Sequence, residues 1–199
     1  MATRREIKRR IRSISNTAQI TKAMQMVAAA RMRRAQQRVE ASRPYAENIN
    51  DIVADIASRP GAQDHPLLAR RPVDSVDIVT ITPDRGLAGA LVGNLNRETL
   101  RLRRDLDTST RIIAVGRKGR DFAVRAGMDL AGYYTNLGDH PSIADIAPIA
   151  REVLDDYETG TADAVYLIYS EFISTLRQQA KAVQLIPVIP PAEATVRSS

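Results

Sequence analysis

The chain has 199 residues, a formal net charge of +6 and no cysteine, so disulfide bonds and thiolate metal sites are excluded. No apolar run is long enough to span a bilayer, and no apolar core follows the basic N-terminus. We therefore expect neither a membrane-spanning helix nor a secretory signal.

Residues 4–58 predict one long helix, because few breakers interrupt a pattern of apolar and small residues that alternates by four and three. At roughly 1.5 Å per residue this helix would be about 80 Å long, so we expect a partner helix along its heptad seam. Pro44 removes a backbone donor, and we expect a kink near Arg43 or a short break there. The N-terminal half of the heptad seam consists of Ile7, Ile11, Ile14, Ala18, Thr21, Gln25 and Ala28.

The same helix is strongly basic, since Glu6 is the only acid before Glu40. A basic helix fits an acidic partner, which could be nucleic acid, an anionic membrane or an acidic protein surface, while the simplest alternative is a solvated basic face. No aromatic residue interleaves with the basic run as base stacking would require, and the heptad seam favours a helical partner.

Residues 59–72 are rich in proline, glycine and polar side chains and form a predicted connector. After it, strands and helices alternate along the chain, which is typical of a mostly parallel sheet with helices on its faces. The predicted strands are residues 75–82, 111–115, 130–135, 164–169 and 182–189. The predicted helices are residues 87–104, a short helix that ends at Ala126, and residues 142–158 with Ser142 as its cap.

The predicted fold class is therefore α/β, with a long N-terminal coiled-coil-type helix at residues 1–58 and a small Rossmann-like α/β domain at residues 73–191. We expect residues 192–199 to be a disordered tail.

The sequence contains no recognisable catalytic, cofactor-binding or metal-binding constellation, and we expect no cofactor. The turns at residues 84–89 and 116–119 match neither the P-loop nor the dinucleotide fingerprint, and a tight strand-to-helix turn explains their glycines. His65 and His140 lack the spacing of metal ligands. The acidic residues at the end of one helix are interpreted as a solvated surface rather than a carboxylate pair; they are Asp155, Asp156 and Glu158.

Several motifs, in chain order, resemble the gamma subunit of the F-type ATP synthase, the rotor of its central stalk. They are residues 11–29, Ser42–Tyr45, Asp84–Gly89, Gly116–Gly119, Glu171–Ser174 and Leu185–Pro187. The resemblance implies a non-catalytic shaft that couples transmembrane proton flow to ATP synthesis or hydrolysis in a ring of alpha and beta subunits. It also implies the epsilon subunit and the membrane c-ring as partners, no nucleic acid, and a peripheral position on the cytoplasmic side of a bacterial cell membrane rather than an organelle inner membrane.

The resemblance also indicates which side chains contact the ring, whose beta subunits carry acidic loops in this family. The expected contacts are Lys22, Met24, Arg31, Arg33 and Arg34. The long C-terminal helix that pairs with the N-terminal helix in the family has no counterpart here, so we expect a fragment or a truncated form whose heptad seam lacks its intramolecular partner. Two alternatives are a basic coiled-coil protein that binds nucleic acid and a small nucleotide-binding enzyme built on the α/β domain.

Overall fold

The structure is a computed structural model that describes residues 3–59, 61, 65–69, 71–138 and 140–188. The chain divides into two compact units, residues 1–50 and residues 51–199. The predicted tail at residues 192–199 lies outside the described residues, and the predicted domain limits stay predictions.

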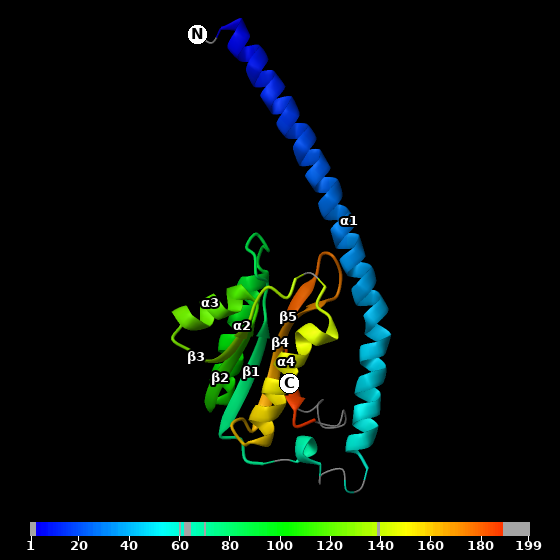
Figure 1. The fold of residues 1–199 in the computed structure, drawn as a ribbon, viewed down its shortest axis with the longest axis vertical. Coiled ribbons are helices and arrows are strands. Elements are labelled where there is room, and N and C mark those ends of the chain that lie inside the picture. Colours follow the sequence, from blue (N-terminus) through cyan, green and yellow to red (C-terminus); the bar gives the residue numbers. More distant parts are fainter. Residues whose placement is uncertain (1–2, 60, 62–64, 70, 139, 189–199) are drawn as a thin grey trace. The chain divides into compact units, whose positions relative to one another are not determined.

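Helix α1 (Arg4–Ala57) contains 54 residues and confirms the long predicted helix (Figure 1). It begins with a reciprocal cap, because the Glu6 carboxylate accepts a hydrogen bond from the Thr3 amide at 2.7 Å and the Thr3 hydroxyl accepts one from the Glu6 amide at 3.4 Å. Of the kink near Arg43 or the short break that the sequence predicts, the break is wrong, since the helix continues through Pro44, while the kink stays a prediction. Pro44 lies on the exposed surface, where water can bond the carbonyl that loses its helical donor.

A five-stranded sheet with the order β3-β2-β1-β4-β5 forms the second unit (Figure 1). All neighbouring strands are parallel except β4 and β5, which pair antiparallel. The mostly parallel sheet that the sequence predicts is therefore confirmed. The strands are β1 (Ser75–Ile81), β2 (Ser109–Val115), β3 (Asp129–Tyr134), β4 (Ala164–Phe172) and β5 (Gln178–Ile186).

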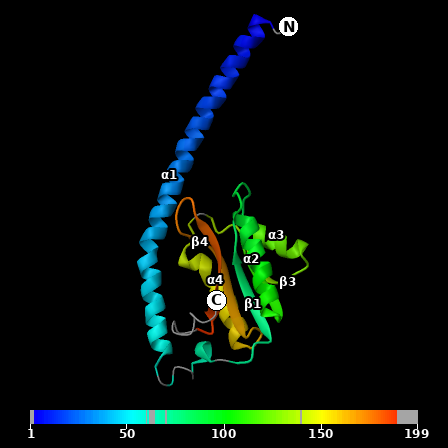
Figure 2. The ribbon, with the colours of Figure 1, turned by 180° about the vertical axis from the view of Figure 1, so that it is seen from behind.

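Helices cover both faces of this sheet. Helices α2 (Leu91–Leu106) and α3 (Arg117–Arg125) lie on one face of the sheet, and α4 (Ile143–Glu158) lies on the other face. Figure 2 shows the sheet and these helices from the side opposite to that of Figure 1. Because side chains alternate along a strand, β1 contributes Val76 and Ile78 to the core under α2 and α3 and Val79 to the core under α4. Ser142 caps α4 through a capping box with Asp145, as the sequence predicts.

Helix α2 begins at Leu91 rather than at the predicted Leu87. Leu87 and Gly89 have φ angles of 60° and 58°, which belong to the left-handed region and cannot continue a right-handed helix. The loop between β1 and α2 is consequently longer than predicted.

Strand β5 begins at Gln178 rather than at the predicted Ala182, and it ends at Ile186. The additional residues are polar except for Ala180, so no apolar alternation marked them as a strand, but they pair with the end of β4 in a hairpin. The Lys181 ammonium lies 3.1 Å from the Glu171 carboxylate across this hairpin. A short 3-10 helix, η2 (Pro66–Leu68), lies in the predicted connector.

The end of the connector is fastened to the C-terminal end of α4 by Arg71. Its guanidinium lies 4.5 Å from the centre of the Tyr157 ring and 2.7 Å from the Asp163 carboxylate. The Tyr157 hydroxyl in turn donates a hydrogen bond to the Ala69 carbonyl at 2.7 Å. Because Tyr157 is only 1% exposed, these contacts join the connector to the core under α4.

Gly116 lets the turn after β2 approach the end of β1. Its φ angle is 101°, and a Cβ atom at this position would lie 1.9 Å from the Thr82 carbonyl oxygen. The Thr82 hydroxyl accepts a hydrogen bond from the Gly119 amide at 2.7 Å. A residue without a side chain is therefore required where β2 passes into α3.

We expect Gly116→Ala to lower the free energy of unfolding by about 3 kcal/mol, because it adds both a clash with backbone and an unfavourable φ angle. Gly93 is the matched control, since it lies in α2 with nothing within 4 Å of an added Cβ atom. Gly93→Ala should raise stability by up to about 1 kcal/mol. Urea unfolding of the full chain measures both effects, and an unchanged midpoint for Gly116→Ala would contradict this account.

Candidate functional site

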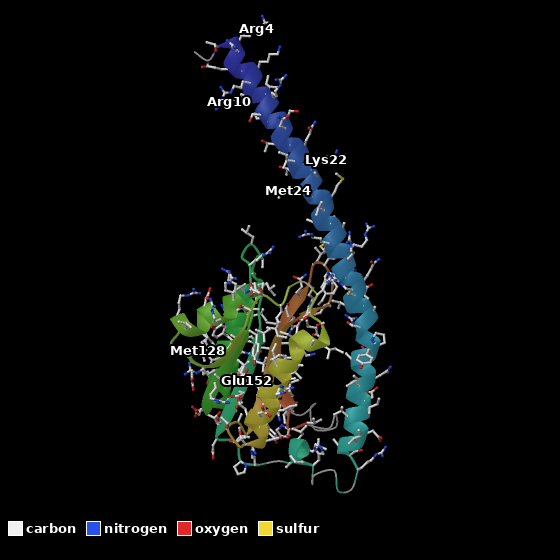
Figure 3. The ribbon with its side chains drawn as sticks, in the orientation of Figure 1. Arg4, Arg10, Lys22, Met24, Met128 and Glu152 are labelled. Atoms are coloured by element: carbon white, nitrogen blue, oxygen red, sulfur yellow. The ribbon has the colours of Figure 1, made fainter. Side chains whose placement is uncertain are left out.

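The surface of α1 in residues 3–49 is exposed and carries almost only positive charge. Its side chains are exposed at every position of this range except Gln36, which is half-buried. Figure 3 shows Arg4, Arg10 and Lys22 projecting from the helix. Such a concentration of cations favours contact with an acidic surface. The cationic residues before Glu40 are Arg4, Arg5, Lys8, Arg9, Arg10, Arg12, Lys22, Arg31, Arg33, Arg34 and Arg38.

The heptad seam is exposed along the same helix. Ile7, Ile11 and Ile14 are 51%, 62% and 64% exposed, and Ala18, Thr21, Gln25 and Ala28 are exposed as well. Thr21 satisfies its hydroxyl within the helix by donating to the Thr17 carbonyl at 2.9 Å. A stripe of apolar, small and uncharged residues of this kind, with heptad spacing, marks a surface that another helix can cover.

The five predicted ring contacts are exposed, and they surround the heptad seam rather than form one patch. At 3.6 residues per turn, Lys22 lies beside the seam on one side, and Met24 and Arg31 lie beside it on the other side. Arg33 and Arg34 lie further round the helix, toward the face opposite the seam. None of the five lies on the seam itself, so a partner helix and the predicted ring contacts do not compete for the same side of α1.

The carboxyl edge of the parallel sheet, where Rossmann-like folds commonly hold ligands, is occupied by side chains of the chain itself. One oxygen of the Asp84 carboxylate accepts a hydrogen bond from the Arg117 amide at the start of α3, at 2.9 Å. The other oxygen accepts one from the Asn136 amide after β3, also at 2.9 Å. A carboxylate therefore fills the anion position at this helix start and joins the loops that follow three strands.

One interpretation of the α4 carboxylates is wrong. Asp155 and Glu158 are exposed as predicted, but Asp156 is half-buried, and its carboxylate lies 2.6 Å from the Arg111 guanidinium. Arg111 also binds Asp77, which is fully buried on β1. Asp156 thus shares a cation with a carboxylate that the sequence analysis did not single out, because the two residues lie far apart in the chain.

Comparisons with known proteins agree in family. Residues 3–199 match the sequence profile of the ATP synthase family. The chain is 45% identical over 192 residues to the ATP synthase gamma chain of Dehalococcoides mccartyi strain BAV1, which covers 96% of this chain and 67% of that protein. It is 44% identical over 202 residues to the ATP synthase gamma chain of Roseiflexus sp. strain RS-1, covering 99% of this chain and 70% of that protein.

A solved structure is similar as well. The central stalk and c-ring structure of the Tetrahymena thermophila mitochondrial ATP synthase contains a chain with a TM-score of 0.68 and 28% identity, and the match covers 84% of this chain and 72% of that chain. These relatives give no support to nucleic-acid binding. Among the described residues, no helix is both long and apolar enough to cross a membrane.

We expect Asp84→Ala to lower the free energy of unfolding by about 1–3 kcal/mol, because two backbone amides lose their acceptor at once. Asp105→Ala is the matched control, since Asp105 lies on the exposed surface of α2, where its carboxylate pairs with Arg101 and Arg104. It should change stability by less than about 0.5 kcal/mol. Equal urea midpoints for the two variants would show that Asp84 does not hold this edge together.

Proposed function

This chain belongs to the family of ATP synthase gamma chains, and from this we propose that it is the non-catalytic rotor shaft of an F-type ATP synthase. In this role it couples transmembrane proton flow to ATP synthesis or hydrolysis in the ring of alpha and beta subunits. The observation that carries the proposal is the family match over residues 3–199, together with a 54-residue helix whose apolar seam and basic surface are both exposed.

The arrangement of side chains on α1 fits such a shaft. The heptad seam takes a partner helix, since two helices joined along a seam resist bending and twisting better than one. The remaining sides of α1 then face the ring, and there Lys22, Met24, Arg31, Arg33 and Arg34 make the contacts. The positive charges of Lys22, Arg31, Arg33 and Arg34 meet acidic loops of the beta subunits, whereas Met24 makes an uncharged contact. The five residues point in several directions, so a shaft that turns can present different side chains to the same subunit.

The α/β domain forms the foot of the shaft and contacts the epsilon subunit and the membrane c-ring. The chain lies on the membrane peripherally, on the cytoplasmic side of a bacterial cell, and is held there by these partners. A foot of this kind needs rigidity more than a ligand site. The Asp84 bridge supports this assignment, because it ties three loops of the sheet together with the chain's own carboxylate.

The double variant Arg33→Glu/Arg34→Glu tests the ring contacts in the full chain mixed with alpha and beta subunits. Reversing two charges should slow association roughly tenfold at low salt, and the effect should shrink as salt screens the charges. Arg103→Glu/Arg104→Glu on α2 makes the same change of charge at two exposed residues and serves as the control. Unchanged association of the α1 variant, measured by surface binding and copurification, would remove these two residues from the proposed contacts.

The heptad seam is tested by comparing two isoleucines with similar exposure. Ile14 lies on the seam and is 64% exposed, whereas Ile20 lies off the seam and is 61% exposed. In the isolated chain we expect the seam to associate with the seam of a second copy. Ile14→Gln should then raise the Kd of self-association roughly tenfold, because it removes the free energy gained by partly burying an isoleucine side chain. Ile20→Gln should change it little. Analytical ultracentrifugation measures the self-association of both variants. Equal effects of the two substitutions would indicate nonspecific association through exposed apolar residues of α1 rather than pairing along the seam.

A further inference from the structure

Helix α4 meets the sheet through one apolar edge and one polar edge. Ile149, Val153 and Tyr157 pack into the core with Val79 of β1 and Val165 of β4. The polar edge consists of Glu152 and Asp156, which face β1, β2 and β3. The charged and titratable groups that meet there are Asp77 on β1, Arg111 on β2, Tyr134 on β3, and Glu152 and Asp156 on α4.

Two carboxylates share one guanidinium in this contact. Arg111 binds Asp77 with two nitrogens, at 2.9 and 2.8 Å. The nitrogen that makes the second of these bonds also binds Asp156, at 2.6 Å. Asp77 is 0% exposed, while the side chains of Arg111 and Asp156 are 20% and 22% exposed. With both carboxylates ionised the three groups carry a net negative charge at a site largely removed from water, which is unfavourable.

A third carboxylate adds to this excess of negative charge. The Glu152 carboxylate lies against the backbone of Gly132 in β3. A Cβ atom added at Gly132 would lie only 2.2 Å from the Oε1 atom of Glu152. Its carboxylate accepts a hydrogen bond from the Tyr134 hydroxyl. Burial, with a contribution from Glu152, raises the pKa of Tyr134 to about 12, so this hydroxyl remains a donor at neutral pH. Arg111 is therefore the single cation among the described groups that face this edge of α4.

We propose that the Asp77–Arg111–Asp156 cluster is a proton-operated latch for α4, in which one proton taken up from solvent by the carboxylate pair tightens the helix against the sheet. When Asp77 is neutral, its hydroxyl has the Asp156 carboxylate as a neighbouring acceptor, and Arg111 remains to balance the charge of Asp156. When Asp77 is ionised, its carboxylate and that of Asp156 repel each other across Arg111. Because Asp77 lies on the sheet and Asp156 lies on α4, this repulsion acts between the sheet and the helix.

The direction of the pH effect follows from the buried carboxyl. Burial raises the pKa of Asp77 from 3.8 to about 6, while Arg111 lowers it and Asp156 raises it further. The folded protein therefore binds this proton more tightly than the unfolded chain does. The resulting stabilisation is complete below the ordinary pKa of 3.8 and is lost as the pH rises through about 6.

Native-state hydrogen exchange of the full chain tests the latch. The protection factors of the Ile149, Val153 and Tyr157 amides should fall about tenfold between a pH of about 5 and about 7.5, after correction for intrinsic exchange. The amides of Leu95 and Thr99 in α2 serve as the internal reference and should change much less. Protection in α4 that does not fall, or that falls equally in α2, overturns a latch acting on α4.

Two substitutions separate the latch from a general effect of acidity. Asp77→Asn keeps the shape of the side chain and removes its charge, so α4 should be equally protected at both pH values. Asp155→Asn is the control for charge on α4, because Asp155 is exposed next to Asp156, and it should keep the pH dependence of the natural chain. A pH dependence that survives in Asp77→Asn overturns the proposal.

A spectroscopic measurement keeps the test decisive if Asp77→Asn does not fold. The carboxyl carbon of Asp77 in the natural chain can be followed by nuclear magnetic resonance as the pH changes. The latch predicts a titration midpoint near the raised pKa of about 6. A midpoint at the ordinary value near 3.8 would show that no proton is held there at neutral or mildly acidic pH, and the proposal would fail.

Discussion

A helix of 54 residues cannot bury itself, and this constraint governs what the rest of the chain has to do. Isolated helices owe little of their stability to propensity alone, so in proteins most of it comes from packing an apolar face against something else. Helix α1 presents such a face as the heptad seam and surrounds it with cations. In a free chain this combination invites association. In the proposed role within an ATP synthase, the same exposed surfaces are the ones that neighbouring subunits would cover.

The α/β unit differs from α1 because it buries two apolar cores of its own, one on each face of the sheet. Val76 and Ile78 anchor the core under α2 and α3, whereas Val79 anchors the core under α4. The fold is one that elsewhere binds nucleotides at the carboxyl edge of its sheet. Here Thr82 and Asp84 use the backbone amides of that edge for internal hydrogen bonds. The likeness in architecture therefore does not by itself imply nucleotide chemistry, and at this edge these groups serve to join loops of the chain.

The sequence predicts the features that repeat along the chain. A seam spaced by four and three residues is visible over many turns, and β-branched runs mark the central strands, so α1 and the parallel sheet were predictable. Features that depend on a single backbone angle or on distant partners were not. The left-handed Leu87 moves the start of α2, and polar residues extend β5 by pairing with β4. The bonds of Arg111 to Asp77 and Asp156 join residues 34 and 45 positions apart, which no local pattern reveals.

The hydrogen bonds of Asp84 bear on how the α/β domain responds to the concentrations of nucleotides and phosphate in a cell. A domain that takes up a phosphate at the carboxyl edge of its sheet has an empty and a loaded form, and the ratio of the two follows the concentration of the ligand. At the carboxyl edge of this sheet the anion is the Asp84 carboxylate, which belongs to the chain and is always present. Swings in the levels of ATP, ADP or phosphate then have no second form to select at this edge. In the proposed shaft, torque passes through a domain in which the chain's own carboxylate joins these loops, without a bound ligand to do so.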